Sequence, residues 1–170
     1  MRTNSNRERA MPGHIVTSYD ADLAALDRTI AEMGGHCERL LTNAFAALER
    51  RDPKRAAAAA ASDADIDALE RQLQEQAIRM IARRQPMAND LHHVMTVIKI
   101  ASDLERIGDL AKNIAKRAIA VANETPPKPL LTGLGHMTEH ALGQLKDVLD
   151  AYAVRDAGTA MVLRPRSRCW

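Results

Sequence analysis

Apolar residues recur along this chain at alternating steps of three and four, which is the pattern of helices that each bury one face. The first such segment predicts a helix over residues 18–51, because its apolar positions form a heptad seam. Gly34 and Gly35 lie inside this segment and predict a place where it can bend. The seam consists of Leu23, Leu26, Ile30, Met33, Cys37, Leu40, Ala44 and Ala47.

Two further helices follow after short connections. Asp52 can cap free backbone amides and Pro53 suits a first helical position, so we expect a second helix over residues 53–84. Pro86 ends that helix and begins a third, over residues 86–123. Connections this short predict that consecutive helices are antiparallel neighbours in a bundle.

A proline-rich segment separates these helices from a fourth, which we expect over residues 131–155. The apolar positions of the fourth helix are Leu134, Met137, Ala141, Leu145, Val148 and Tyr152. The chain offers this stripe no bundle of its own, and we expect the prolines to hinder it from folding back. It therefore predicts pairing with a second copy or with a partner.

The fold class predicted is all-α: an antiparallel three-helix bundle with one or so helices of an incomplete second bundle. The expected division is a disordered tail (1–16), the first bundle (17–124), a linker (125–130), a partial second bundle (131–163) and an irregular tail (164–170).

Composition narrows the classes of function. Aromatic residues make up 2% of the chain, which disfavours sheets and leaves few rings for stacking on bases. Basic residues gather at the two ends and leave a mildly acidic body, which is not the pattern of a nucleic-acid-binding surface. With two distant cysteines, no leader-like segment and no run of 18 apolar residues, we expect a cytoplasmic protein with free thiols and no transmembrane segment.

Two pairs of acidic residues are placed symmetrically about the turn at Pro86. Asp67 and Glu105 each lie 19 residues from it, and Asp63 and Asp109 each lie 23 residues from it. In an antiparallel pair of helices, residues equidistant from the turn come level. The spacing therefore predicts four carboxylates in one place, and such oxygen ligands suit hard cations such as magnesium, calcium, manganese or iron.

An alternative keeps these acids on a solvated helix face, neutralised by Arg71, Arg106 or Lys112. No histidine lies at a matching height, which argues against zinc. Gly108 sits among the acids, where alanine would stabilise a helix by about 1 kcal/mol. It predicts a close backbone approach, either by a neighbouring helix or by a bound ion.

The same region resembles a known family. The segment DLERIGDLAKNIAKR is similar to the signature of the PhoU family of phosphate-signalling proteins, and the resemblance covers roughly residues 19–156. It implies two tandem three-helix bundles, each with an acidic E/D-x-x-x-D motif able to hold a metal ion (iron, manganese, magnesium or zinc). The residues that match the motif pair are Asp63, Asp67, Glu105 and Asp109. The other signature positions are Asp103, Arg106, Asn113 and Arg117.

The resemblance implies a regulator and not an enzyme. Such proteins repress phosphate uptake and phosphate-starvation signalling as adaptors between a phosphate ABC transporter and a sensor histidine kinase, often as homodimers. That places the protein in the cytoplasm, at the inner membrane face. The alternative function is a metal-binding helical bundle, either purely structural or an enzyme with a di-metal centre.

The sequence also departs from the family pattern. A second acidic motif of the ERIGD kind is absent, and the ending LRPRSRCW does not resemble the family's fifth helix. This predicts a chain truncated at its C-terminus, or a reading frame altered near Val162.

Overall fold

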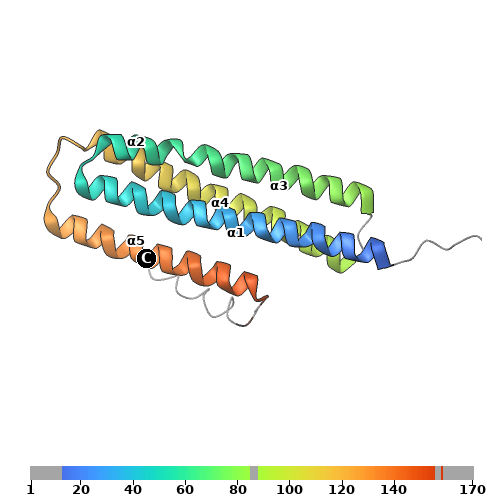
Figure 1. The fold of residues 1–170 in the computed structure, drawn as a ribbon. Helices are drawn as coiled ribbons and strands as arrows, with labels where there is room; N and C mark the ends of the chain where they lie inside the picture. The colour runs from blue at the N-terminus through green and yellow to red at the C-terminus, as the bar shows by residue number, and fades with distance from the viewer. Residues whose placement is uncertain (1–12, 85–87, 156–157, 159–170) are drawn as a thin grey trace, which may run out of the picture.

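The computed structural model describes residues 13–84, 88–155 and 158, which form helices and no strand. The all-α class predicted from the sequence is therefore confirmed. In chain order the helices are α1 (Gly13–Arg50), α2 (Pro53–Ala61), α3 (Asp63–Arg84), α4 (Ala88–Ala120) and α5 (Lys128–Ala153). The long helices lie side by side, and the short helix α2 is followed end to end by α3 (Figure 1).

Helix α1 is the element that the others share, because it contacts α2, α3, α4 and α5. Its predicted heptad seam is confirmed: seven of the eight seam residues are buried and Leu23 is partly buried against them. Each large apolar side chain buried in this way stabilises the fold by about 1.5–3 kcal/mol. The seven buried residues are Leu26, Ile30, Met33, Cys37, Leu40, Ala44 and Ala47.

The prediction of a single helix over residues 53–84 is wrong, because the structure divides this segment at Ser62 into α2 and α3. The predicted start is confirmed, since the Asp52 carboxylate accepts hydrogen bonds from the amides of Lys54 and Arg55, both at 3.0 Å. At the division the Ser62 hydroxyl donates to the Ala59 carbonyl at 2.8 Å. A serine that bonds its own backbone in this way competes with helix continuation.

The position of α5 corrects another expectation. We expected the prolines to hinder this helix from folding back onto the bundle. Instead, α5 packs along α1 on the side away from α2 and α3 (Figure 1). The helix begins at Lys128, inside the expected linker, because Pro129 falls in the first turn, where its missing amide costs no hydrogen bond. Of its apolar stripe, Leu145 is buried, whereas Met137 and Val148 remain exposed.

The ends of the chain differ in part from the expected boundaries. Helix α1 already begins at Gly13, within the tail expected over residues 1–16, while residues 1–12 lie outside the described part. The irregular tail expected over residues 164–170 lies outside it as well. Within the described residues, no helix is long and apolar enough to cross a membrane. The division into a first bundle over residues 17–124 and a partial second bundle over residues 131–163 stays a prediction.

Gly34 permits the contact between α1 and α5, because a Cβ atom at this position would collide with the Leu149 side chain. At Gly35, a Cβ atom would meet only the end of Arg39, at 3.3 Å. We expect Gly34→Val to destabilise the fold by about 1–3 kcal/mol through overpacking. The matched control Gly35→Val should be close to neutral. Urea unfolding measures both, and equal effects would contradict the α1–α5 packing.

Candidate functional site

The prediction that two acidic residues lie at the same height on adjacent helices is confirmed for one pair. Asp63 on α3 and Asp109 on α4 come together around one cation, the ammonium group of Lys112. The Lys112 Nζ atom lies 2.5 Å from Asp63 Oδ2 and 3.1 Å from Asp109 Oδ1. Of the three basic residues considered as counter-ions from the sequence, the fold thus uses Lys112.

Asp63 is the most constrained member of the site, with a side chain only 2% exposed. It is the first residue of α3, where the free amides of the helix end favour a negative charge. Asp109 is 50% exposed and Lys112 is 27% exposed. The ion pair therefore runs from the protein interior towards solvent, with its anchored end at Asp63.

Gly108 explains how α3 can lie so close to α4. A Cβ atom at this position would lie 2.8 Å from Ile66 Cδ1 and 3.1 Å from Asp63 Oδ1. The prediction of a close approach is confirmed, and a neighbouring helix makes it. Any larger residue would press on the side chain whose charge the site must neutralise.

The neighbouring acidic residues lie close enough to affect the pKa of Glu105. Burial raises the pKa of Glu105, and the negative charges of Asp109, Glu70 and Asp67 raise it further. Hydrogen bonds to Asp63 and then to Asp109 raise the pKa of Lys112, which keeps its ammonium charged. The site is a cluster of carboxylates with one internal cation.

The metal ion that the resemblance implies would need carboxylate oxygens of this cluster as ligands. One oxygen of Asp63 and one oxygen of Asp109 already accept hydrogen bonds from Lys112. In the part of the chain that the structure describes, no group of three or more histidine, cysteine or acidic side chains is arranged as metal ligands. These residues fit a metal only if the ammonium group moves away, and the metal stays a prediction.

The other signature residues do not complete the site. Asp103, Arg106, Asn113 and Arg117 are all exposed on α4. Within the described residues, none of the four makes a hydrogen bond or ion pair with the acids.

Cys37 faces the site from α1 and is a buried free thiol. Its Sγ atom donates a hydrogen bond to the Leu104 carbonyl at 3.2 Å. Burial, followed by the nearby charge of Asp63, raises the pKa of this thiol to about 12. Cys37 is therefore an inert packing residue and not a nucleophile or ligand.

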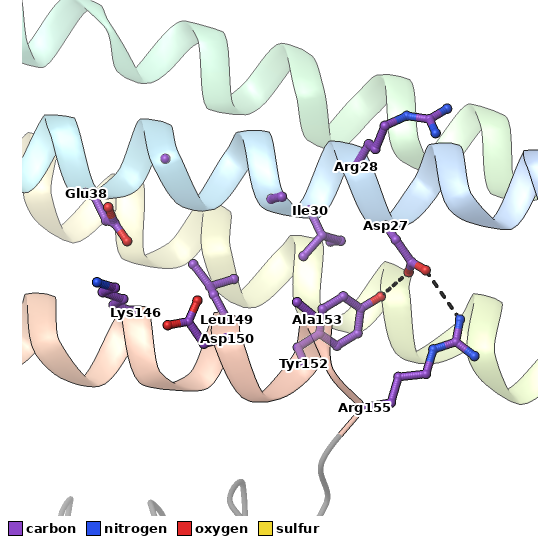
Figure 2. A pocket seen from close by; sticks show the side chains of 12 residues that line it. Asp27, Arg28, Ile30, Glu38, Lys146, Leu149, Asp150, Tyr152, Ala153 and Arg155 are labelled. Carbon is purple, nitrogen blue, oxygen red and sulfur yellow. Dashed lines mark hydrogen bonds and ion pairs between the residues drawn. The ribbon is translucent and has the colours of Figure 1, made fainter.

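A second polar cluster joins three helices, and sequence reasoning missed it. The Asp27 carboxylate on α1 accepts a hydrogen bond from the Tyr152 hydroxyl at 2.5 Å and lies 3.1 Å from His93 Nε2 on α4. Arg155 forms a longer pair with it at 3.5 Å. Figure 2 shows Asp27, Tyr152 and Arg155 at one end of a cleft of about 560 Å³ between α1 and α5.

No spacing signal could have revealed this cluster, because Asp27 and Tyr152 are 125 residues apart in the sequence. They meet only because α5 folds back along α1. Burial and then the hydrogen bond to Asp27 raise the pKa of the Tyr152 hydroxyl, so it stays a donor at neutral pH. The cluster fixes the last turn of α5 to the bundle.

Comparison with known proteins shows which family this chain is similar to. Residues 30–118 match the family described as the PhoU domain. The chain is 48% identical, over 90% of its own length, to the "phosphate-specific transport system accessory protein PhoU homolog" of Rhizobium meliloti, of which it covers 65%. It is 34% identical to the Escherichia coli protein of similar name, over 87% of this chain and 61% of that protein.

The fold is shared as well. The crystal structure of PhoU from Pseudomonas aeruginosa superposes with a TM-score of 0.80 at 33% sequence identity, over 85% of this chain and 69% of that one. The chain spans about two thirds of the length of the relatives that it matches.

We expect the Tyr152→Phe variant to lose about 0.5–1.5 kcal/mol of unfolding free energy, because it removes the hydroxyl that binds Asp27. In an Asp27→Ala background the same change should cost almost nothing, since its acceptor is gone. Urea unfolding of the four proteins measures this coupling. A cost that is the same in both backgrounds would show that the hydroxyl does not fix α5 through Asp27.

Proposed function

Since this chain belongs to the PhoU family, we propose that it is a regulator of phosphate uptake and phosphate-starvation signalling. The observation that carries the proposal is the family match over residues 30–118, which includes the ERIGD acids and the helix that holds them. The relatives are named as accessory proteins of a phosphate-specific transport system. A regulator of that system needs surfaces for other proteins more than it needs a reacting group.

We further propose that the protein is an adaptor between the ATPase of a phosphate ABC transporter and a sensor histidine kinase. Exposed apolar side chains on α3 and α4 support this role, because protein interfaces are built around such groups. Ile78 on α3 is 63% exposed and Met95 on α4 is 54% exposed. They lie eight residues before and nine after Pro86, so they come nearly level at one end of the helix pair.

Both proposed partners imply a place in the cytoplasm at the inner membrane face. The exposed part of the α5 stripe, Met137 and Val148, supports a homodimer, because these side chains lie outside the contact with α1. The alternative function, a metal-binding helical bundle that is either structural or a di-metal enzyme, gains no specific support from the site. In the described arrangement the acids are engaged with Lys112 and with each other.

The adaptor role predicts capture of both partners. The purified chain, immobilised and exposed to a lysate of its source, should retain the phosphate-transporter ATPase and a sensor histidine kinase, and the amounts should change with phosphate supply. Ile78→Glu with Met95→Glu should reduce capture at least tenfold without loss of folding, because both positions are exposed. Val154→Glu, at a position that is 74% exposed on the C-terminal side of α5, is the matched control.

Capture of neither protein under either phosphate condition would contradict the adaptor role. Capture that the Ile78 and Met95 changes leave intact would place the interface elsewhere on the molecule.

A further inference from the structure

We infer that one end of the helix bundle is a docking surface for the anionic headgroups of a lipid membrane. This end, which we call the basic end, consists of residues 47–56, where α1 ends and α2 begins, and residues 116–131, where α4 ends and α5 begins. Figure 1 shows both segments at the same end of the molecule. A hydrogen bond joins them, because the Arg51 guanidinium donates to the Thr125 hydroxyl at 3.2 Å. Docking of this kind would not depend on the proposed role in phosphate regulation.

The basic end differs in charge from the rest of the chain. It carries seven basic and three acidic residues, whereas the other residues between 13 and 155 carry six more acidic than basic ones. All ion pairs among the described residues lie outside the basic end, so no salt bridge neutralises its cations there. All but Arg55 are exposed. The seven basic residues are Arg50, Arg51, Lys54, Arg55, Lys116, Arg117 and Lys128.

Helix stability does not account for all of these charges. A basic residue is favourable in the last turn of a helix, which explains Arg50 on α1 and Arg117 on α4. Lys54, Arg55 and Lys128 instead lie in the first turns of α2 and α5, where the helix dipole disfavours a positive charge. No acidic residue occupies either of these first turns. An anionic partner would relieve this repulsion.

Exposed apolar side chains lie among the basic groups. Leu130 is 54% exposed and Ile119 is 40% exposed. An apolar cleft of about 460 Å³, lined by Leu48, Ile114 and Leu131 among others, lies between the ends of α1 and α4 and the start of α5. At a membrane surface, cations attract anionic headgroups while apolar side chains enter the region just below them. A lipid surface is therefore a partner that uses both features of the basic end.

A nucleic acid fits this surface less well. The basic end contains no aromatic side chain that could stack on a base. Its exposed apolar groups are aliphatic side chains and prolines, which suit lipid chains better than base edges.

Local charge decides this contact more than the charge of the whole chain. Physiological salt screens exposed charges over about 8 Å, whereas a helix of 30 residues is about 45 Å long. Acidic residues further along the helices therefore weaken the attraction little. Because the long helices lead away from the basic end (Figure 1), contact there holds most of the acidic remainder away from the lipid.

Sedimentation of the full chain with lipid vesicles tests this inference. We expect at least about tenfold stronger binding to phosphatidylcholine vesicles that contain about 30% phosphatidylglycerol than to phosphatidylcholine alone. Raising the salt concentration should release the protein, because salt screens the attraction. Equal binding to both kinds of vesicle, or binding to neither, would overturn the inference.

Two variants that lose the same charge locate the surface. The first removes three exposed cations of the basic end and should weaken binding to the anionic vesicles at least about tenfold. It combines Arg50→Gln, Lys54→Gln and Lys128→Gln. The matched control removes three exposed cations outside the basic end and should change binding less than about twofold. It combines Arg83→Gln, Lys99→Gln and Lys146→Gln. An equal loss in both variants would overturn the inference.

A third variant separates a lipid surface from an acidic macromolecule. Leu130→Gln with Ile119→Gln keeps every charge and should weaken vesicle binding at least about threefold, because fewer apolar groups enter the lipid. Undiminished binding by this variant would overturn the assignment to lipid and favour an acidic macromolecule as the partner. Circular dichroism checks that each variant is folded. If the first variant does not fold, salt dependence in the wild-type chain decides: binding to anionic vesicles that persists at high salt would overturn the inference.

Discussion

The burial of one carboxylate, Asp63, constrains the rest of this structure. Moving an ionised carboxylate out of water costs several kcal/mol unless a cation and hydrogen bonds replace the water. Here the cation is Lys112, and it reaches Asp63 only if α3 and α4 lie close together at one register. Gly108 provides that closeness, and the start of α3 at Asp63 supplies favourable amide groups. The register of the helix pair follows from the same requirement.

Small residues extend this principle to the other contacts of the bundle. Ala47, Ala56 and Ala118 form a buried cluster where α1, α2 and α4 meet, and Gly34 admits Leu149 where α5 meets α1. Few aromatic side chains are available to fill space, so the helices must approach closely to exclude water. The polar cluster at Asp27 then fixes α5 at a defined position, because sliding along α1 would break its bond to Tyr152.

The features that could be predicted from the sequence depend on the regular spacing of apolar residues or on the number of residues from a turn. The heptad seam of α1 and the level of Asp63 with Asp109 are of this kind, because regular helices convert spacing directly into position. The break at Ser62 was missed, since it depends on a local bond between a side chain and the backbone. The docking of α5 was missed because it depends on contacts between residues far apart in the sequence, such as Gly34 and Leu149. Lys112 was foreseen only as one of three candidates, since the choice depends on burial.

A double-mutant cycle on Asp63 and Lys112 tests most directly the claim that their ion pair holds α3 against α4. Lys112→Met alone should destabilise the protein strongly, by about 3–5 kcal/mol, because it leaves a buried charge without its partner. After Asp63→Asn has removed that charge, the same Lys112→Met change should cost far less. We predict a coupling free energy of at least about 1.5 kcal/mol by urea unfolding. Additive effects, with a coupling near zero, would contradict the account.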